Sequence, residues 1–290
     1  MKMSSSVVLL DKKTGLTSFS SLGVLKRALG RKCGHAGTLD KFASGLLIAF
    51  SGRFTRLNDV FMGLGKVYDA VFEFGKETDT LDPEGEVILK APLPSLEAIM
   101  KALNSFGKNY SQTPPAFSAV HVNGTRAYKL ARSGNEVPIA AKEVRLESFE
   151  VKDWNPPFLS IKLEVSKGFY VRSFARDLAK RAGSCAYVSS LRRTQIGPYR
   201  VEDAVSCDDL EEIQRSSSVF DPIEFLSRLS GVQRIELTDK GKELISHGVI
   251  PSSSMEEVDD QSSLILFCHE GRLCSITDAK GRFICQAETE

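Results

Sequence analysis

The feature that most limits the fold is a series of short strand-like segments interrupted by only a few helices. Residues 67–74, 144–151 and 158–165 alternate apolar and polar side chains, the period of a half-buried strand. Amphipathic helices are predicted at 96–106 and 173–182. The pattern predicts an α+β fold with a mixed, mainly antiparallel central sheet and flanking helices, rather than a doubly wound βαβ fold.

A change in composition near residue 226 predicts a second, smaller domain. The acidic stretch 202–212 and the Arg-Ser-Ser-Ser run at 215–218 have the character of a connector. From residue 232 onward the predicted elements are short, with one helix at 239–246 and several strands. We therefore predict a main domain at 1–226 and a compact β-rich domain at 227–290.

Bulk composition excludes several classes of protein. No run of eighteen apolar residues occurs, so no membrane-spanning helix is predicted, and the polar start followed by a short apolar stretch predicts a cytoplasmic protein. The six cysteines form no C-x-x-C pair and the four histidines form no H-E-x-x-H motif. The sequence therefore predicts free, mostly buried thiols and no metal site.

Charge is distributed unevenly along a chain whose net charge is only +1. Residues 1–60 hold ten Lys or Arg against three Asp or Glu, and residues 161–200 hold nine against two. Residues 201–226 hold one against eight. Two basic blocks in a nearly neutral chain fit a groove that follows phosphates, although either block alone also fits a solvated helix face.

A glycine-containing segment, Gly-His-Ala-Gly-Thr-Leu-Asp at residues 34–40, precedes the continuous apolar run at 45–50. The glycines predict a tight loop and the apolar run predicts a buried strand behind it. A carboxylate on such a loop, Asp40, is a candidate nucleophile or acid–base group. The competing interpretation is that Asp40 caps the element that follows it.

Other polar residues suggest what this carboxylate acts on. Tyr68 lies on a predicted strand, while Tyr170 and Arg172 lie in the Lys-Gly-Phe-Tyr-Val-Arg run. An arginine keeps a neighbouring carboxylate ionised, and a tyrosine ring stacks on a nucleobase. Together with the basic blocks, these residues fit chemistry on a nucleotide extruded from an RNA stack, although each tyrosine alone also fits core packing. No phosphate-binding glycine motif supports a nucleotide cofactor.

Ordered sequence blocks extend this pattern over roughly residues 7–200. They comprise residues 11–12 and 15–18, 34–40 with 43–45 and 52–56, 66–68, 78–80 with Asp82 and Gly85, Pro114 with 118–119, Gly124 with Tyr128, 166–173, and 191–193. In this order they resemble the bacterial TruB-type tRNA pseudouridine synthases, which implies a central sheet of the pseudouridine synthase type. The tail resembles, more weakly, a small PUA-type RNA-binding module.

The resemblance implies isomerisation of the T-loop uridine at tRNA position 55 without a cofactor. It implies that Asp40 is the essential carboxylate, attacking the ribose or removing its 2′ proton. Tyr68 would stack on the uracil and accept the carbon-5 proton, and Arg172 would pair with Asp40. The implied substrate-binding residues are His35, Tyr170, Leu191, Lys167 and Arg192. The implied partner is the T-stem-loop of tRNA, bound by a monomer with no protein partner and no membrane.

Three departures from the family pattern stand outside this set: Lys13 replaces a proline, Phe117 a tyrosine and His121 a lysine. Two rival functions remain open at this point. One is an RNA chaperone that opens and refolds the tRNA elbow, either with or without catalysis. The other is a related enzyme directed to ribosomal RNA by a guide RNA, which the absence of long basic tails disfavours.

Overall fold

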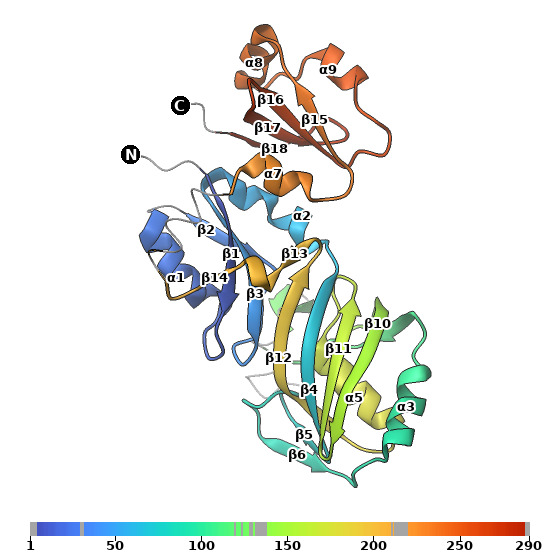
Figure 1. Cartoon of the computed structure of the whole chain (residues 1–290). Helices are drawn as coiled ribbons and strands as arrows, with labels where there is room; N and C mark the ends of the chain where they lie inside the picture. The colour runs from blue at the N-terminus through green and yellow to red at the C-terminus, as the bar shows by residue number, and fades with distance from the viewer. Residues whose placement is uncertain are drawn as a thin grey trace. The chain divides into compact units, whose positions relative to one another are not determined.

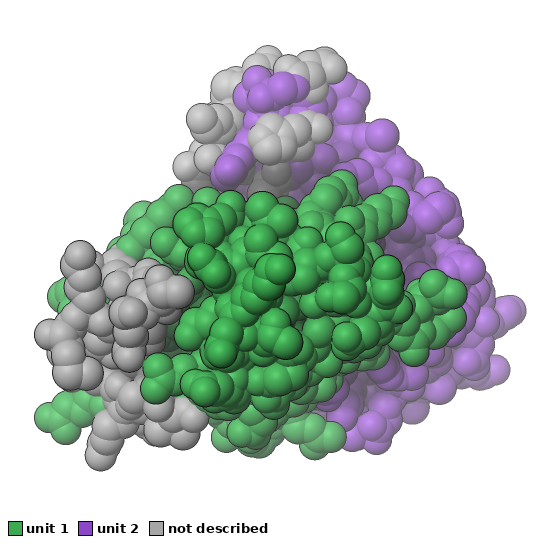
Figure 2. Space-filling model, turned by 90° about the horizontal axis from the view of Figure 1, so that it is seen from above, with its two compact units in different colours: residues 1–40, 45–63, 197–290 green, residues 41–44, 64–196 purple. Residues whose placement is uncertain are grey.

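The computed structural model describes residues 5–29, 32–118, 120–122, 124–127, 130, 138–209, 211 and 220–287. Figure 1 shows its helices and strands and labels them where there is room. The chain forms two compact units, coloured separately in Figure 2: unit 1 contains residues 1–40, 45–63 and 197–290, and unit 2 contains residues 41–44 and 64–196. In the described part of the chain, no helix is both long and apolar enough to span a membrane.

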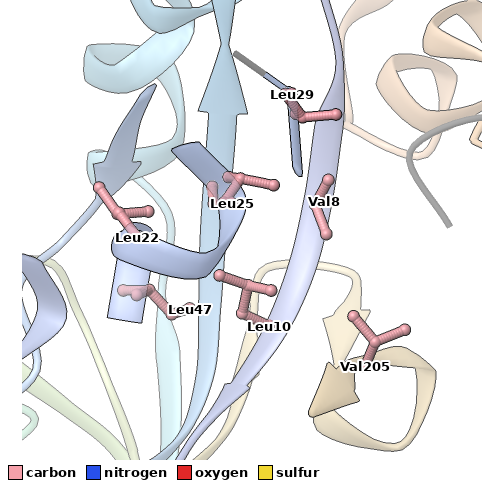
Figure 3. Packing of buried hydrophobic residues seen from close by; sticks show 8 residues of the cluster. Val8, Leu10, Leu22, Leu25, Leu29, Leu47 and Val205 are labelled. Atoms are coloured by element: carbon pink, nitrogen blue, oxygen red, sulfur yellow. The ribbon is translucent and has the colours of Figure 1, made fainter. Parts of the chain in front are cut away.

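The N-terminal part of unit 1 is a small sheet covered by one helix. Strand β1 (Val7–Lys12) pairs antiparallel with β3 (Ser44–Ser51), which also pairs antiparallel with β2 (Cys33–Ala36). Strand β14 (Val205–Ser206) adds to β1 in parallel. Helix α1 (Ser18–Leu29) packs on these strands through Leu22, Leu25 and Leu29, which form one buried cluster with Val8, Leu10 and Leu47 (Figure 3). These apolar residues recur at helical spacing, so one face of α1 is buried.

A group of aromatic rings joins the next elements of unit 1. Strand β3 continues into the 3₁₀-helix η1 (Gly52–Leu57) and helix α2 (Asn58–Met62). The short strand β13 (Tyr199–Arg200) and the 3₁₀-helix η2 (Val201–Asp203) precede β14, and helix α7 (Pro222–Ser227) follows it. Phe225 of α7 stacks on Tyr199 with 4.3 Å between ring centroids and lies 5.9 Å from Phe61.

The C-terminal part of unit 1 is a four-stranded sheet with two short helices. Its strands are β15 (Val232–Glu236), β16 (Leu264–His269), β17 (Arg272–Asp278) and β18 (Phe283–Gln286), in that order, with only β15 and β16 parallel. Helices α8 (Asp239–Ser246) and α9 (Ser252–Glu256) contribute Ile245 and Met255 to its core. Strand β18 packs against η1, where Arg53 donates to the main-chain oxygen of Ala287 at 3.4 Å.

Unit 2 is built on an antiparallel sheet in the order β12, β4, β11, β10, β7. These strands are β4 (Lys66–Phe74), β7 (Asn109–Gln112), β10 (Lys142–Asn155), β11 (Phe158–Val165) and β12 (Ala186–Ile196). Two-stranded ribbons are formed by β5 (Lys76–Thr78) with β6 (Val87–Lys90) and by β8 (His121–Val122) with β9 (Thr125–Arg126).

Helices α3 (Leu96–Asn104) and α5 (Val171–Arg181) pack on each other, and α5 also packs on β12. Ser95 caps α3 by accepting a hydrogen bond from the main-chain nitrogen of Ala98 at 3.1 Å. The completely buried Phe174 of α5 meets the rings of Phe72 and Phe106. An aromatic core thus holds α5 in place, and α5 carries the candidate site residue Arg172.

The predicted fold class is confirmed, as are the strands at 67–74, 144–151 and 158–165. Four of the six cysteines are buried and all six are free thiols, as predicted. The predicted loop at 34–40 is wrong in its first half, because residues 34–36 belong to β2. The motif residue Tyr128 lies outside the described residues, as do residues 210 and 212–218 of the predicted connector.

Candidate active site

Asp40 lies in the turn that connects β2 and β3. Gly37 has a φ of +79°, a conformation that side-chain-bearing residues rarely adopt, and it begins the turn. The buried Ser18 hydroxyl accepts from the nitrogen of Leu39 at 2.8 Å and donates to its oxygen at 2.9 Å. The residue before Asp40 is therefore fixed to the first turn of α1.

Asp40 itself is half-buried. Lys41 and Phe42 form a turn and β3 begins at Ser44, so Asp40 caps no helix. The element that follows Asp40 is the turn at residues 41–42, and the interpretation that Asp40 caps it stays a prediction. The predicted RNA-binding residue His35 lies half-buried on β2, opposite Ala49 of β3.

Arg172 is buried in the first turn of α5, with only 4% of its surface exposed. Its Nη1 donates to the main-chain oxygen of Thr80 at 2.9 Å and lies 3.2 Å from Oδ2 of Asp82. Its Nη2 donates to the main-chain oxygen of Phe117 at 3.0 Å. Three acceptors on two separate segments thus fix the plane of the guanidinium.

The loop at residues 78–86 supplies two of these acceptors. Its Leu81 has a φ of +61°, which is strained for a bulky residue, and it separates Thr80 from Asp82. Asp82 Oδ1 accepts from the Thr80 hydroxyl at 2.6 Å and from the main-chain nitrogen of Glu84 at 3.0 Å. The loop is therefore held by its own hydrogen bonds in the shape that Arg172 binds.

The same loop binds the residue that follows Asp40 in the chain. Lys41 Nζ lies 2.8 Å from Oε1 of Glu84, and Arg192 Nη1 of β12 lies 3.4 Å from the Ser44 hydroxyl. Within unit 2, the segment at residues 41–44 is therefore joined to both loop 78–86 and β12. The predicted pairing of Arg172 with Asp40 links residues of different units and stays a prediction.

Tyr68 and Leu191 lie on adjacent strands. Tyr68 of β4 is opposite Arg193 of β12, and Leu191 is opposite Ala70. Since alternate residues of a strand share a face, Tyr68, Leu191 and Arg193 face one side of the sheet. Tyr68 is 8% exposed and Leu191 6%, so each offers a narrow accessible edge. Arg192 points to the opposite face of β12, and its predicted contact with substrate remains a prediction.

Tyr170 sits at the residue before α5 and is held by its main chain. Its nitrogen donates to Oε1 of the buried Gln112 at 2.8 Å, and its oxygen accepts from Nε2 of Gln112 at 3.1 Å. One amide therefore satisfies both main-chain groups at the start of the helix. Tyr170 keeps a half-exposed side chain, and Lys167 is exposed just before it.

Three charged residues that the structure places among these side chains, one acid and two cations, were not predicted to be site residues. Asp82, Lys66 and the fully buried Arg193 were each part of a sequence block but had no assigned role. Lys66 is buried on β4, and burial, with smaller contributions from Arg193 and Lys167, lowers its pKa to about 8. Strand pairing, which brings Arg193 beside Tyr68, is the signal that would have identified it.

The three residues that depart from the family pattern are Phe117, Lys13 and His121. The main-chain oxygen of Phe117 binds Arg172, so the missing tyrosine hydroxyl leaves this contact unchanged. Lys13 forms an ion pair with Asp208 at the surface. His121 lies in β8. Within the described segments, no group of three or more His, Cys, Asp or Glu side chains is arranged to hold a metal ion.

Known proteins share both the sequence and the fold. Residues 26–171 match the N-terminal domain of the TruB family of pseudouridylate synthases, and residues 172–226 match the tRNA pseudouridylate synthase B C-terminal domain. The tRNA pseudouridine synthase B of Borreliella afzelii is 46% identical over 216 residues, covering 72% of this chain and 76% of that protein. That of Borrelia garinii subsp. bavariensis is 38% identical over 285 residues, 96% of each chain. The chain belongs to the TruB family.

Solved structures show that this TruB-family chain has the fold predicted from its sequence. A chain of the archaeal box H/ACA sRNP Nop10–Cbf5 complex has a TM-score of 0.65 and 20% identity, covering 98% of this chain and 85% of that one. A chain of an H/ACA RNP bound to a substrate RNA containing 2′-deoxyuridine has a TM-score of 0.67 and 18% identity, covering 98% and 84%. At these identities the likeness concerns the fold alone, and it confirms the pseudouridine synthase type of sheet.

Proposed function

We propose that this TruB-family protein isomerises the T-loop uridine at position 55 of tRNA to pseudouridine. The observation that carries the proposal is the double attachment of loop 78–86. Asp82 of this loop binds Arg172, and Glu84 binds Lys41, the residue that follows Asp40. The two motifs to which catalytic roles are assigned are thus attached to one element, as a preorganised site requires. The proposed partner is the T-stem-loop, bound in the cytoplasm by a monomer that needs no cofactor.

In this reaction the bond from ribose carbon 1′ to uracil nitrogen 1 breaks, and a bond from carbon 1′ to carbon 5 forms. Nitrogen 1 gains a proton and carbon 5 loses one, so the isomerisation is redox-neutral. Asp40 acts either by attacking carbon 1′ or by removing the 2′ proton, and Arg172 pairs with it. The Tyr68 ring stacks on the extruded uracil. Its hydroxyl oxygen accepts the carbon-5 proton while its own proton passes to solvent, and nitrogen 1 is protonated from solvent.

The remaining residues hold the opened RNA. His35 supports the T-loop after the uridine has left its stack, and Tyr170 with Leu191 lines the uracil pocket. Lys167 and Arg192 contact substrate through their charges. The supporting observations are that Lys167 and Tyr170 border the fixed start of α5 and that Leu191 shares a sheet face with Tyr68.

The decisive variant is Asp40→Asn, which keeps the shape of the side chain but removes its charge. It should abolish tritium release from carbon-5-labelled uridine in a tRNA transcript. Its Kd should stay within about tenfold of that of the parent, because phosphate contacts supply most of the affinity.

The matched control is Asp59→Asn, an exposed carboxylate of α2 in the same unit, which should release tritium at the parent rate. Release by Asp40→Asn at that rate would refute the proposal. The same variant separates catalysis from a chaperone activity, because refolding of the tRNA elbow does not need the carboxylate.

A further inference from the structure

The outer face of α1 carries a large aromatic side chain that takes no part in the core. The inner face buries Leu22, Leu25 and Leu29 against β1 and β3 (Figure 3). At the edge of this buried face, Phe19 leaves 71% of its surface exposed, the largest fraction among the large apolar residues that the structure describes. A ring so exposed adds little to folding stability, since little of its area is removed from water.

Two cations share this face with Phe19. Lys26 and Arg27 follow it by seven and eight residues, two helical turns, so all three project to one side. The Lys26 ammonium lies 4.1 Å from the centroid of the Phe19 ring. A Cβ added to Gly23 would lie 3.7 Å from Nη1 of Arg27, so the guanidinium extends back along the helix toward Phe19.

The positive charge of this face is not neutralised locally. No Asp or Glu occurs between Asp11 and Asp40 in the sequence. Among the described residues, no carboxylate forms an ion pair with Lys26 or Arg27, whereas the nearby Lys13 is paired with Asp208. The face therefore combines an exposed aromatic ring with two uncompensated cations that follow it by about two helical turns.

We propose that this face, formed by Phe19, Lys26 and Arg27, is an RNA contact in addition to the uridine site. In this contact Phe19 stacks on an unpaired base, and the two cations hold adjoining phosphates. The inference rests on the proposed function, because it takes the RNA substrate as its partner.

The chemistry favours RNA over a protein partner. A single ring is too small for a stable apolar interface, whereas it matches the area of one nucleobase. Cations beside an aromatic ring complement the alternation of base and phosphate along an unpaired strand. An acidic peptide would use the cations and leave the ring without a function.

The test is binding of the full chain to a fluorescein-labelled tRNA transcript, followed by anisotropy. Phe19→Ala should raise Kd by about 5- to 100-fold, because one stacked base is lost, while Phe19→Trp should bind at least as tightly as the parent. Arg27→Gln should lower the slope of log Kd against log salt by about 0.7 to 1, the value for one phosphate contact.

Phe158→Ala is the matched control, since Phe158 is a 41% exposed ring on β11 of unit 2. Equal Kd values for Phe19→Ala and Phe158→Ala would overturn the inference and leave a protein as the occupant of the face. That outcome would not change tritium release by the parent, so the proposed function would stand. A parent chain that binds the transcript but releases no tritium would refute the proposed function instead, and the Kd of Phe19→Ala would still decide this inference.

Discussion

At the scale of single residues, the most unusual group is Lys66, a buried lysine close to other cations. It is 8% exposed, and its Nζ donates to the main-chain oxygen of Leu64 at 2.5 Å. Burial and the positive charges of Arg193 and Lys167 disfavour the protonated form and lower its pKa to about 8. Proximity to Tyr68 on the same strand makes this charge part of the electrostatics of the candidate site.

The lowered pKa makes a prediction for stability. The folded chain loses the Lys66 proton near pH 8, whereas the unfolded chain keeps it up to the ordinary pKa of 10.5. Between these values the unfolded state binds more protons, so the contribution of Lys66 to the free energy of unfolding rises with pH. Its slope approaches about 1.4 kcal/mol per pH unit. Below pH 8 the cost of burying the charge is present in full.

Urea denaturation of the parent and of Lys66→Met measures this contribution, because subtraction removes groups that titrate in both chains. The free energy of unfolding of the parent minus that of Lys66→Met should increase between pH 8 and 10.5. Lys101→Met, at an exposed position of α3, should show a flat difference. A flat difference for Lys66→Met as well would mean that Lys66 titrates at its ordinary pKa in the fold.

Residues 191–193 show what the sequence predicted at this scale and what it did not. The three residues form one of the sequence blocks that carry the family resemblance, and the structure places them on β12. Which arginine shares a face with Tyr68 depends on how β12 pairs with β4, and this pairing contains two register shifts. A bulge reverses the face of every residue beyond it, and nothing in local composition reveals it.

At the scale of elements, loop 78–86 depends on one glycine. A Cβ on Gly85 would lie 2.2 Å from Oδ1 of Asp79 and 2.3 Å from the Thr80 hydroxyl. Gly85→Ala therefore has to displace the segment that places the Thr80 oxygen and Asp82 against Arg172. We expect a loss of about 1–3 kcal/mol in the free energy of unfolding. Tritium release should fall with it, because Arg172 loses its fixed position.

Gly34→Ala is the control for this loop. A Cβ there would meet only the methyl group of Thr55 at 3.6 Å, an ordinary contact, and its backbone is that of a strand. Its free energy of unfolding should stay close to that of the parent. Equal stability of Gly85→Ala and Gly34→Ala in urea would show that loop 78–86 adapts freely.

Helices and strands were predicted correctly where the residues of a single segment carry the pattern. The strand behind the Asp40 turn was predicted from a continuous apolar run, and α8 was predicted with its observed bounds. The start of the turn was not predicted correctly, because residues 34–36 lack an apolar pattern and become a strand only through pairing with β3. Asp82 was likewise left without a role, since its partner Arg172 is 90 residues away in the sequence.

At the scale of the whole molecule, the domain boundary at 226/227 stays a prediction, and unit 1 is assembled from three separated segments of the chain. The predicted boundary falls inside α7, whose Phe225 and Leu226 are buried. Helix α7 packs on β15 and β17 on one side, while Phe225 stacks on Tyr199, whose hydroxyl donates to the Phe225 oxygen at 2.7 Å. Contacts between segments that are far apart in the sequence determine which segments form one unit. The composition of a single segment does not reveal these contacts.

This arrangement predicts that the tail and the N-terminal sheet of unit 1 are stabilised together. Phe225→Ala should lower the free energy of unfolding by about 3–5 kcal/mol, since it removes a fully buried ring. Hydrogen exchange should then quicken in both β1 and β16, because α7 contributes to the packing of both parts. Val249→Ala, at a half-exposed site of the tail, should change neither. Faster exchange confined to β16 would instead identify the tail as an independent module, because its loss of packing would stop at α7 and leave the N-terminal sheet of the TruB-family fold intact.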